Sequence, residues 1–266
     1  MSKINLIVGN TSQLAPYFPN DYLGVSSRDI DYSQFKNVEF DRVIITFAEQ
    51  RTYIMDNEKM FAEVNVDQTL EAIKFFAPHS RYVVVYGTCE LWNNFEGAVN
   101  INTPFKYDYS PYRQSKEIMA DQIKTLNLKN VIVLHTFNFN SPYRKPGFLF
   151  SKIFNSIINK ETIEIGDTYF YRDLIHPEYV VSRSIKATEN EIVGLGRLVF
   201  VNDFIRELYA SQDMEYEKYV KEDLSKSFTG PPRNIFYADV RRPQYSYENL
   251  LNATINDIRK FKYQTS

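Results

Sequence analysis

Short runs of apolar residues alternate with longer amphipathic stretches through the first half of the chain. Apolar runs of this kind predict strands, and the stretches between them predict crossover helices, which together build a parallel sheet. The sequence predicts strands at residues 4–8, 22–26, 42–47, 82–87 and 131–137. Continuous apolar strands need cover on both faces, so the pattern favours a doubly wound α/β sheet.

Two long helices are predicted in this half, over about residues 55–76 and over residues 112–126. The apolar residues that suit one side of the first helix are Met60, Val64, Leu70 and Ile73. The second half loses the regular alternation. It contains helix-like segments at residues 148–157 and 247–261, and a strand followed by a helix at residues 197–211, with Asn202 or Asp203 near the helix cap.

No repeat, low-complexity run or linker separates the two halves. Loop-like composition is confined to residues 228–234, where a glycine and paired prolines stop any helix. We therefore expect a first domain at residues 1–140, to which residues 170–193 return. Residues 141–169 and 194–266 are expected to form a small cap on it rather than an independent domain.

Composition narrows the classes of function. The chain has 266 residues and a net charge of −2, which gives no electrostatic reason to bind nucleic acid or an anionic membrane. It contains 41 aromatic residues but only 9 glycines, a scarcity that counts against folds with glycine-rich turns. A single cysteine excludes a disulfide framework and fits a reducing cytoplasm. With no secretory signal and no apolar run long enough for a membrane helix, we expect a cytoplasmic protein.

The three histidines and the acidic residues show no metal-ligand spacing, so no metal site is predicted. We expect His79 at the surface and His135 in the core of its strand. His176 is expected to be structural rather than catalytic.

The residues after the first strand, from Gly9 to Ala15, are the first candidate for chemistry. A dinucleotide site needs a tight turn here, so that the pyrophosphate meets backbone N–H groups at the start of a helix. Gly9 takes the first glycine position, while Ser12 and Ala15 stand where the second and third glycines would be. Both substitutes are small enough for a close backbone approach. The motif alone leaves a dinucleotide site and an ordinary strand-to-helix turn both open.

Ser27 and Arg28 follow the second strand, where an acidic residue would bind the ribose 2′-hydroxyl of NAD. A guanidinium suits the geometry of a phosphate, so this pair favours NADP over NAD. A solvated surface arginine is the alternative, because Asp29 is adjacent.

Tyr112 and Lys116 lie four residues apart at the start of a predicted helix. On the same face, the lysine charge lowers the pKa of the phenol and holds a cofactor ribose, while the tyrosine exchanges a proton with a substrate hydroxyl. Among 20 tyrosines, about one such pair arises by chance. Thr88 and Glu90 strengthen the prediction, because they follow a strand at the sheet edge where ligands bind. Glu90 is a candidate base, with a solvent-exposed loop carboxylate as the alternative.

The order of Gly9, Thr88, Tyr112 and Lys116 resembles the extended short-chain dehydrogenase/reductases that act on nucleotide sugars. Four segments carry the resemblance. Residues 103–116 resemble the segment that leads into the family's catalytic Tyr-x-x-x-Lys helix, and residues 135–153 its substrate-nucleotide segment. Residues 171–181 resemble its Arg-Asp-x-Ile-His turn, and residues 65–73 its long interface helix. The resemblance implies a Rossmann fold with a small C-terminal substrate-binding cap, an NADP or NAD cofactor, and a homodimer.

The resemblance also implies the roles of individual residues. The catalytic residues would be Thr88, Glu90, Tyr112 and Lys116. The cofactor site would consist of Tyr112 and Lys116 together with Gly9, Thr11, Ser12, Gln13, Leu14, Ser27, Arg28, Phe47 and Ala48. The sugar nucleotide would be held by Asn138, Lys152 and Arg172, with the two cations facing its diphosphate.

Within the family, the position two residues after the catalytic hydroxyl separates the activities. This chain has Glu90 there, which is typical of 4,6-dehydratases and UDP-glucuronate decarboxylases, whereas epimerases often have a small or hydroxyl residue. Residues 137–153 are most similar to GDP-mannose 4,6-dehydratases. The chain departs from them in its length, in its glycine-poor turn, and in Cys89, where dehydratases usually have Ser or Asp.

A dehydratase of this family would form a 4-keto-6-deoxy sugar. Tyr112 would take the C4 hydroxyl proton as hydride leaves C4, and Thr88 would orient that hydroxyl. Glu90 would remove the C5 proton as water leaves C6, and hydride would return to C6. An epimerase, reductase or decarboxylase would share every residue except the role of Glu90. A non-catalytic dinucleotide sensor is the alternative from another class, but a sensor has no need of the Thr88, Tyr112 and Lys116 set.

Overall fold

The computed structural model describes residues 4–28, 30–52, 58–106, 110–223, 225, 235–240 and 245–265. The chain forms two compact units, each built from segments that are distant in sequence. Unit 1 comprises Met1–Leu91, Phe105–Thr136 and Val180–Val193. Unit 2 comprises Trp92–Pro104, Phe137–Tyr179 and Gly194–Ser266.

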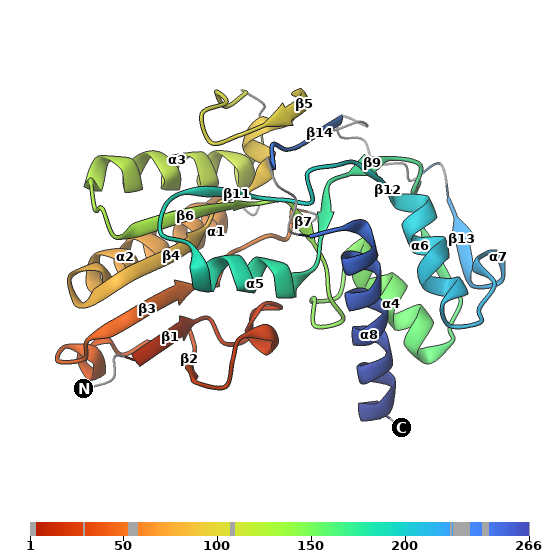
Figure 1. Cartoon of the computed structure of the whole chain (residues 1–266), viewed down its shortest axis with the longest axis horizontal. Helices are drawn as coiled ribbons and strands as arrows, with labels where there is room; N and C mark the ends of the chain where they lie inside the picture. The colour runs from red at the N-terminus through yellow and green to blue at the C-terminus, as the bar shows by residue number, and fades with distance from the viewer. Residues whose placement is uncertain are drawn as a thin grey trace. The chain divides into compact units, whose positions relative to one another are not determined.

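A six-stranded parallel sheet forms the centre of unit 1 (Figure 1). Its strands are β1 (Ile4–Val8), β2 (Tyr22–Val25), β3 (Phe40–Ile45), β4 (Ser80–Tyr86), β6 (Val131–Thr136) and β11 (Glu191–Val193). They pair in the order β11-β6-β4-β3-β1-β2. The five strands predicted from apolar runs are all present, and β11 adds a sixth at the edge.

Helices cover both faces of this sheet. On one face, α2 (Thr69–Phe76) and α3 (Pro111–Leu126) share a hydrophobic core with β3, β4 and β6. On the other face lies α5 (Pro177–Lys186), whose last turn receives the buried guanidinium of Arg42 from β3. Nη1 of Arg42 donates to the Ser184 carbonyl oxygen at 3.0 Å. This arrangement confirms the predicted doubly wound α/β fold.

The connections on either side of β2 contain no α-helix in the described residues. They contain only the 3₁₀ turns η1 (Ala15–Tyr17) and η2 (Tyr32–Phe35). Pro16 lies in the first turn of η1, a position that tolerates proline, but Pro19 follows the C-cap and lacks the N–H that a continuing α-helix needs. Both interpretations of the turn after the first strand predicted that a helix follows it. That prediction is wrong for the described residues, because Pro19 ends η1 after one turn.

The predicted helix over residues 55–76 is described from Glu58 onward, while residues 53–57 lie outside the described part of the chain. α1 (Glu58–Ala62), a π-helical segment η3 (Glu63–Gln68) and α2 follow one another without a break. Leu70 and Ile73 are buried as predicted, whereas Met60 is 41% exposed. The wider π turn changes the phase between α1 and α2, which takes Met60 off the buried face.

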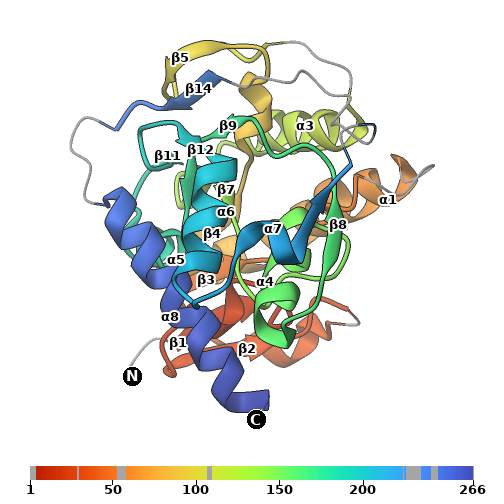
Figure 2. The ribbon, with the colours of Figure 1, turned by 90° about the vertical axis from the view of Figure 1, so that its right-hand side faces the viewer.

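Unit 2 holds four two-stranded pairs and a group of helices (Figure 2). The parallel pairs are β5 (Glu96–Val99) with β14 (Ile235–Ala238), β7 (Asn138–Phe139) with β10 (Leu174–Ile175), and β8 (Ile163–Ile165) with β13 (Val220–Glu222). The antiparallel pair is β9 (Tyr171–Arg172) with β12 (Val199–Phe200). α8 (Tyr247–Thr265) packs against α4 (Leu149–Asn159) and α6 (Val201–Ala210), and α7 (Tyr216–Tyr219) adjoins α6.

The helices predicted in the second half are confirmed as α4, α6 and α8. α6 is capped by Phe200, so Asn202 lies inside the first turn, where its side-chain amide donates to Thr168 Oγ1 at 2.6 Å. The loop predicted at residues 228–234 lies outside the described residues. Among the helices that the structure describes, none combines the length and the apolar character needed to cross a membrane.

Candidate active site

The helix that carries Tyr112 and Lys116 has a well-defined start. Ser110 is its N-cap and accepts the Arg113 N–H at 3.5 Å, and Pro111 occupies the first helical position. Tyr112 is only 7% exposed and Lys116 only 3%. Because they lie four residues apart on α3, both predicted catalytic side chains share its buried face.

Lys116 reaches the C-terminal end of β4. Its Nζ donates to the Tyr86 carbonyl oxygen at 2.9 Å. Burial lowers the pKa of Lys116 to about 8, so the ammonium is charged below that pH. An ammonium has three N–H donors. Only one of them has a hydrogen-bond partner among the described residues, which leaves two for a ligand.

Gly87, Thr88 and Glu90 continue the chain from this end of β4. A Cβ on Gly87 would lie 2.3 Å from Nδ1 of His135, so only glycine fits against β6 at this point. Thr88 is buried, and its Oγ1 accepts the Glu90 N–H at 3.2 Å, which leaves the hydroxyl proton for a ligand. Glu90 is half-buried within the short 3₁₀ turn η5 (Cys89–Trp92).

His135 in β6 links these groups, although the sequence predicted only that it is buried. That burial is confirmed at 3% exposure. Burial lowers the pKa of His135 to about 4; a hydrogen bond with the Thr88 backbone opposes this shift, and the charge of Lys116 adds to it. A neutral imidazole therefore lies near both Thr88 and Lys116 at neutral pH. This proximity follows from the pairing of β4 with β6, which no local sequence pattern reveals.

Asn65 in η3 fixes the start of α3, the helix that carries Tyr112, and the sequence did not indicate this role. Its Oδ1 accepts the Glu49 N–H at 2.8 Å, and its Nδ2 donates to the Glu49 carbonyl at 3.0 Å and to Ser115 Oγ at 3.0 Å. Ser115 Oγ in turn donates to the Tyr112 carbonyl at 2.7 Å. The fully buried Asn65 thus ties the chain beyond β3 to the turn that carries Tyr112. The sequence placed Asn65 only at the start of an interface helix, which stays a prediction.

The turn after β1 requires a glycine. Gly9 has φ of +104°, and a Cβ there would lie 2.8 Å from Thr46 Oγ1 and 2.9 Å from the Phe47 backbone nitrogen. Gln13 Oε1 is buried in the following turn and has no hydrogen-bond partner among the described residues. The tight turn fits the close approach of a pyrophosphate of a nicotinamide dinucleotide. The Gln13 Oε1 atom is an acceptor, so it suits a donor such as a ribose hydroxyl rather than the phosphate oxygens.

The other residues of this turn differ in what they offer a cofactor. Thr11 is exposed, and Ser12 Oγ accepts the Leu14 N–H at 3.1 Å. Leu14 is 2% exposed, so its side chain belongs to the core rather than to a cofactor site. Because the Leu14 N–H is also taken by Ser12 Oγ, Leu14 has neither its side chain nor its N–H available for the predicted role.

The remaining predicted cofactor residues lie at the carboxyl ends of β2 and β3. Ser27 is half-buried, and Arg28 is exposed with its backbone N–H on Ser26 Oγ at 3.1 Å. Phe47 and Ala48 are half-buried just beyond β3. Asp29, the neighbour that weakened the phosphate interpretation of Arg28, lies outside the described residues.

The predicted substrate residues all belong to unit 2. Asn138 in β7 pairs with Leu174 of β10, two residues beyond Arg172. The Arg172 guanidinium lies 4.6 Å from the centroid of the Phe170 ring, and its Nη1 donates to the Tyr171 carbonyl at 2.7 Å. Lys152 is exposed on α4. The strand pairs therefore bring Asn138 and Arg172 to one part of the unit.

The predicted Arg-Asp-x-Ile-His turn is anchored by buried polar contacts. Asp173 accepts three backbone N–H groups at 2.6 to 3.0 Å, from Leu195, Gly196 and Ala238. His176 Nε2 lies 2.9 Å from Asp257 Oδ2 on α8, with both side chains buried. These contacts fit the expected structural role of His176.

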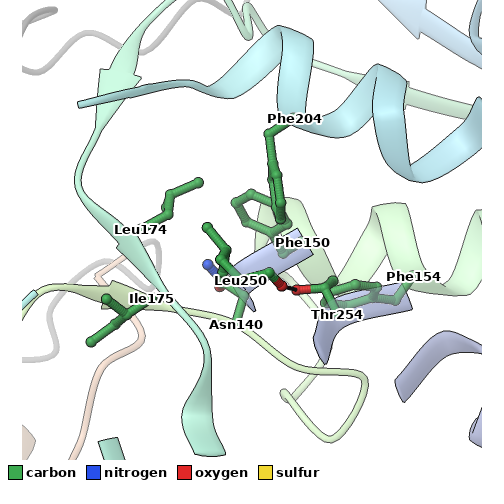
Figure 3. A pocket seen from close by; sticks show the side chains of 8 residues that line it. All are labelled: Asn140, Phe150, Phe154, Leu174, Ile175, Phe204, Leu250 and Thr254. Atoms are coloured by element: carbon green, nitrogen blue, oxygen red, sulfur yellow. Dashed lines mark hydrogen bonds between the residues drawn. The ribbon is translucent and has the colours of Figure 1, made fainter. Parts of the chain in front are cut away.

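A small pocket lies within unit 2 (Figure 3). It is lined by Asn140, Phe150, Phe154, Leu174, Ile175, Phe204, Leu250 and Thr254. The Thr254 hydroxyl already donates to the Leu250 carbonyl at 2.8 Å within α8. None of the predicted site residues lines this mostly apolar pocket, so it is a gap in the packing of α4, α6 and α8 rather than the site of chemistry.

No protein-family model matches the chain, and no curated protein matches it. Solved structures match nearly its whole length. UDP-glucose 4-epimerase from Thermotoga maritima aligns with a TM-score of 0.80 at 16% identity, over 96% of this chain and 98% of that one. dTDP-glucose 4,6-dehydratase from Streptomyces venezuelae, solved with NAD bound, aligns with a TM-score of 0.76 at 18% identity, over 97% and 98%. RMD from Pseudomonas aeruginosa, complexed with NADPH, aligns at 0.75 and 14% identity, over 97% and 100%.

These likenesses confirm the fold that the sequence resemblance implied, that of nucleotide-sugar epimerase and dehydratase structures. At such low identity they show the fold alone. One fold hosts several reactions, so the reaction has to be argued from the residues of the site.

Proposed function

We propose that this chain is a nicotinamide-dinucleotide-dependent enzyme that modifies a nucleotide sugar, by a 4,6-dehydration that forms a 4-keto-6-deoxy sugar. The observation that carries the proposal is the 2.9 Å contact between Lys116 Nζ and the Tyr86 carbonyl. It holds a buried ammonium on the Tyr112 helix at the end of the strand that leads to Thr88. Fold likeness to epimerases and dehydratases supports the substrate class.

Each of four residues has one task in this reaction. The Lys116 ammonium favours the phenolate form of Tyr112, which accepts the proton of the sugar C4 hydroxyl. The free hydroxyl proton of Thr88 donates to the same oxygen and orients it. A bound nicotinamide dinucleotide supplies hydride acceptance and return. The C4 ketone acidifies the C5 hydrogen, which Glu90 removes as a proton and donates to the C6 hydroxyl, so that this group leaves as water. When hydride is returned to C6, a proton from solvent is added at C5.

The proposed cofactor is NADP, with NAD as the alternative. The Gly9 turn, through the backbone N–H groups of Thr11 and Gln13, would hold the pyrophosphate, and the two remaining donors of Lys116 would hold the nicotinamide ribose. Ser27 and Arg28 lie at the end of β2, where the exposed guanidinium suits a 2′-phosphate.

The proposed substrate contacts are Asn138, Lys152 and Arg172, with the two cations on the diphosphate. We place the reaction in the cytoplasm. A homodimer is supported by two exposed apolar side chains on contacting helices, Met60 of α1 at 41% and Ile118 of α3 at 40%. Light scattering of the wild type and of Ile118→Glu tests this interface. We expect the wild type to be a dimer and the variant a monomer. A variant that is still a dimer would contradict the proposed interface.

Product analysis after incubation with NADP and GDP-, UDP-, CDP- or dTDP-hexoses tests the reaction, once a thermal-shift panel has ranked the ligands. We expect a product that is lighter than its substrate by one water. A product of unchanged mass identifies the chain as an epimerase instead. Binding of dinucleotide without turnover of any sugar supports the non-catalytic sensor.

Glu90→Gln separates dehydration from oxidation. We expect this variant to lose dehydration while C4 oxidation remains visible as transient reduced cofactor. Glu63 is exposed on η3, so Glu63→Gln is the control, and we expect it to keep wild-type activity. Full activity of Glu90→Gln removes the proposed base and favours an epimerase or reductase.

A further inference from the structure

Among the residues that the structure describes, no strand pairs with the outer side of β2 in the sheet of unit 1. In the dinucleotide-binding fold each half of the sheet contributes three strands, and the third strand of the first half lies outside the second. Here β2 is the edge strand, and the next strand along the chain, β3, pairs with β1 instead. Residues 26–39, apart from residue 29, contain only η2.

The β2 edge is correspondingly open. Leu23 is 51% exposed, Gly24 is exposed, and Ile4 at the start of β1 is 41% exposed. The adenosine of a dinucleotide would lie beyond the carboxyl end of β2, between the loops that follow the strands of the first half. No described strand or loop stands at this third position, so within the described part of the chain the segment around Ser27 and Arg28 is left to contact the adenosine.

The pyrophosphate turn is also reduced. The N–H groups of Gly9 and Asn10 both donate to the Val25 carbonyl, and the Ser12 N–H donates to the Gly9 carbonyl. In the described turn from Gly9 to Ala15, only Thr11 and Gln13 keep backbone N–H groups without a partner. The three-residue η1 that follows cannot supply the macrodipole of a full helix.

The nicotinamide end is complete by comparison. Lys116 and Thr88 are buried, each is held by a hydrogen bond to the end of β4 or to the chain just beyond it, and each keeps free donors. Tyr112 is fixed through Ser115 and Asn65. The binding groups of unit 1 are therefore concentrated on the nicotinamide mononucleotide half of the cofactor.

We propose, on the basis of the proposed function, that this chain holds its dinucleotide mainly through the nicotinamide mononucleotide half. The adenosine half adds little affinity, and the bound cofactor dissociates and is replaced from solution between turnovers. The exposed Arg28 gives NADPH only a modest advantage over NADH.

Calorimetric titration of the purified full chain tests this with four probes: NADPH, NADH, reduced nicotinamide mononucleotide and ADP-ribose. We expect reduced nicotinamide mononucleotide to bind within about tenfold of NADH, and ADP-ribose at least about tenfold more weakly than the mononucleotide. Arg28→Ala should bring the NADPH affinity to that of NADH, a change of less than about tenfold. No dinucleotide should co-purify with the chain.

Two results overturn the inference while leaving the proposed function intact: ADP-ribose that binds as tightly as NADH, or dinucleotide that co-purifies with the chain. If no probe binds, the dinucleotide-dependent function fails along with the inference. Lys116→Met distinguishes a true nicotinamide site, because it should weaken NADH and the mononucleotide by the same factor. If Lys116→Met melts at the wild-type temperature and still binds NADH and the mononucleotide with wild-type affinity, the inference is also overturned.

Discussion

β4 and β6 on one side of the sheet of unit 1, and β1 and β2 on the other, are all parallel strands, yet they differ in what surrounds them. The β4–β6 side is covered by α2, α3 and α5 and carries Thr88, His135 and Lys116, all buried. On the β1–β2 side, β1 is buried in the same core, but the described connections around β2 contain 3₁₀ turns instead of helices, and β2 has an exposed edge. Buried polar groups with defined partners are the ones that can be preorganised for chemistry. The difference supports the proposal that the β4–β6 side performs the reaction, with the β1–β2 side contributing the Gly9 turn and the charge of Arg28.

The largest effect is expected at Tyr112 on the well-packed side. Tyr112→Phe should lower turnover of the sugar nucleotide about 1,000-fold, because it removes the proton acceptor while keeping the ring. Steady-state kinetics measures this. Tyr86→Phe is the matched control, since its hydroxyl contacts Ser184 Oγ at 2.7 Å rather than the site. Full turnover by Tyr112→Phe would show that the phenol has no chemical role.

Substitution of Asn65 tests whether α3 depends on the hydrogen bonds that Asn65 makes with Glu49 and Ser115. Asn65→Ala should lower the free energy of unfolding by about 2–4 kcal/mol, because it leaves buried groups of Glu49 and Ser115 unsatisfied. Urea unfolding measures this loss. The exposed Asp67→Asn on the same π turn should change the value by less than about 0.5 kcal/mol. Equal effects of the two substitutions would contradict the positioning role.

His135 makes the stability of the well-packed side depend on pH. Its pKa is lowered by burial from 6.5 in the unfolded chain to about 4 in the folded one. The unfolded state therefore binds more protons between these values, so stability falls as the pH drops through this window. The total loss is about 3 kcal/mol below pH 4. Urea midpoints of wild type between pH 8 and pH 5 should fall more than those of His135→Gln. The half-exposed His79→Gln is the control and should follow wild type.

The smallest effect is expected on the β1–β2 side. Leu23→Thr should change the free energy of unfolding by less than about 0.5 kcal/mol, because the side chain is half in solvent and threonine suits a strand. Val84→Thr at the fully buried centre of β4 is the matched substitution. It should cost about 1–3 kcal/mol by burying a hydroxyl. Equal losses would mean that the β2 edge is covered in solution.

The strands could be predicted because each is a continuous apolar run, and α3 because Ser110 and Pro111 mark its start. The absence of a helix after β1 could also have been predicted from the sequence, because Pro19 interrupts the segment. The roles of Asn65 and His135 could not be predicted, because their partners are distant in sequence: Ser115 is 50 residues from Asn65. Only the packing of η3 against α3, and of β4 against β6, brings them together.

The most direct test of a buried lysine and tyrosine as the proton-transfer pair is the pH dependence of kcat/KM. Since burial lowers the pKa of Lys116 to about 8, the ammonium is lost above that pH. We expect kcat/KM to fall about tenfold for each further unit of pH, while circular dichroism shows that the protein is still folded. A profile that stays flat through pH 10 in the folded protein would contradict it.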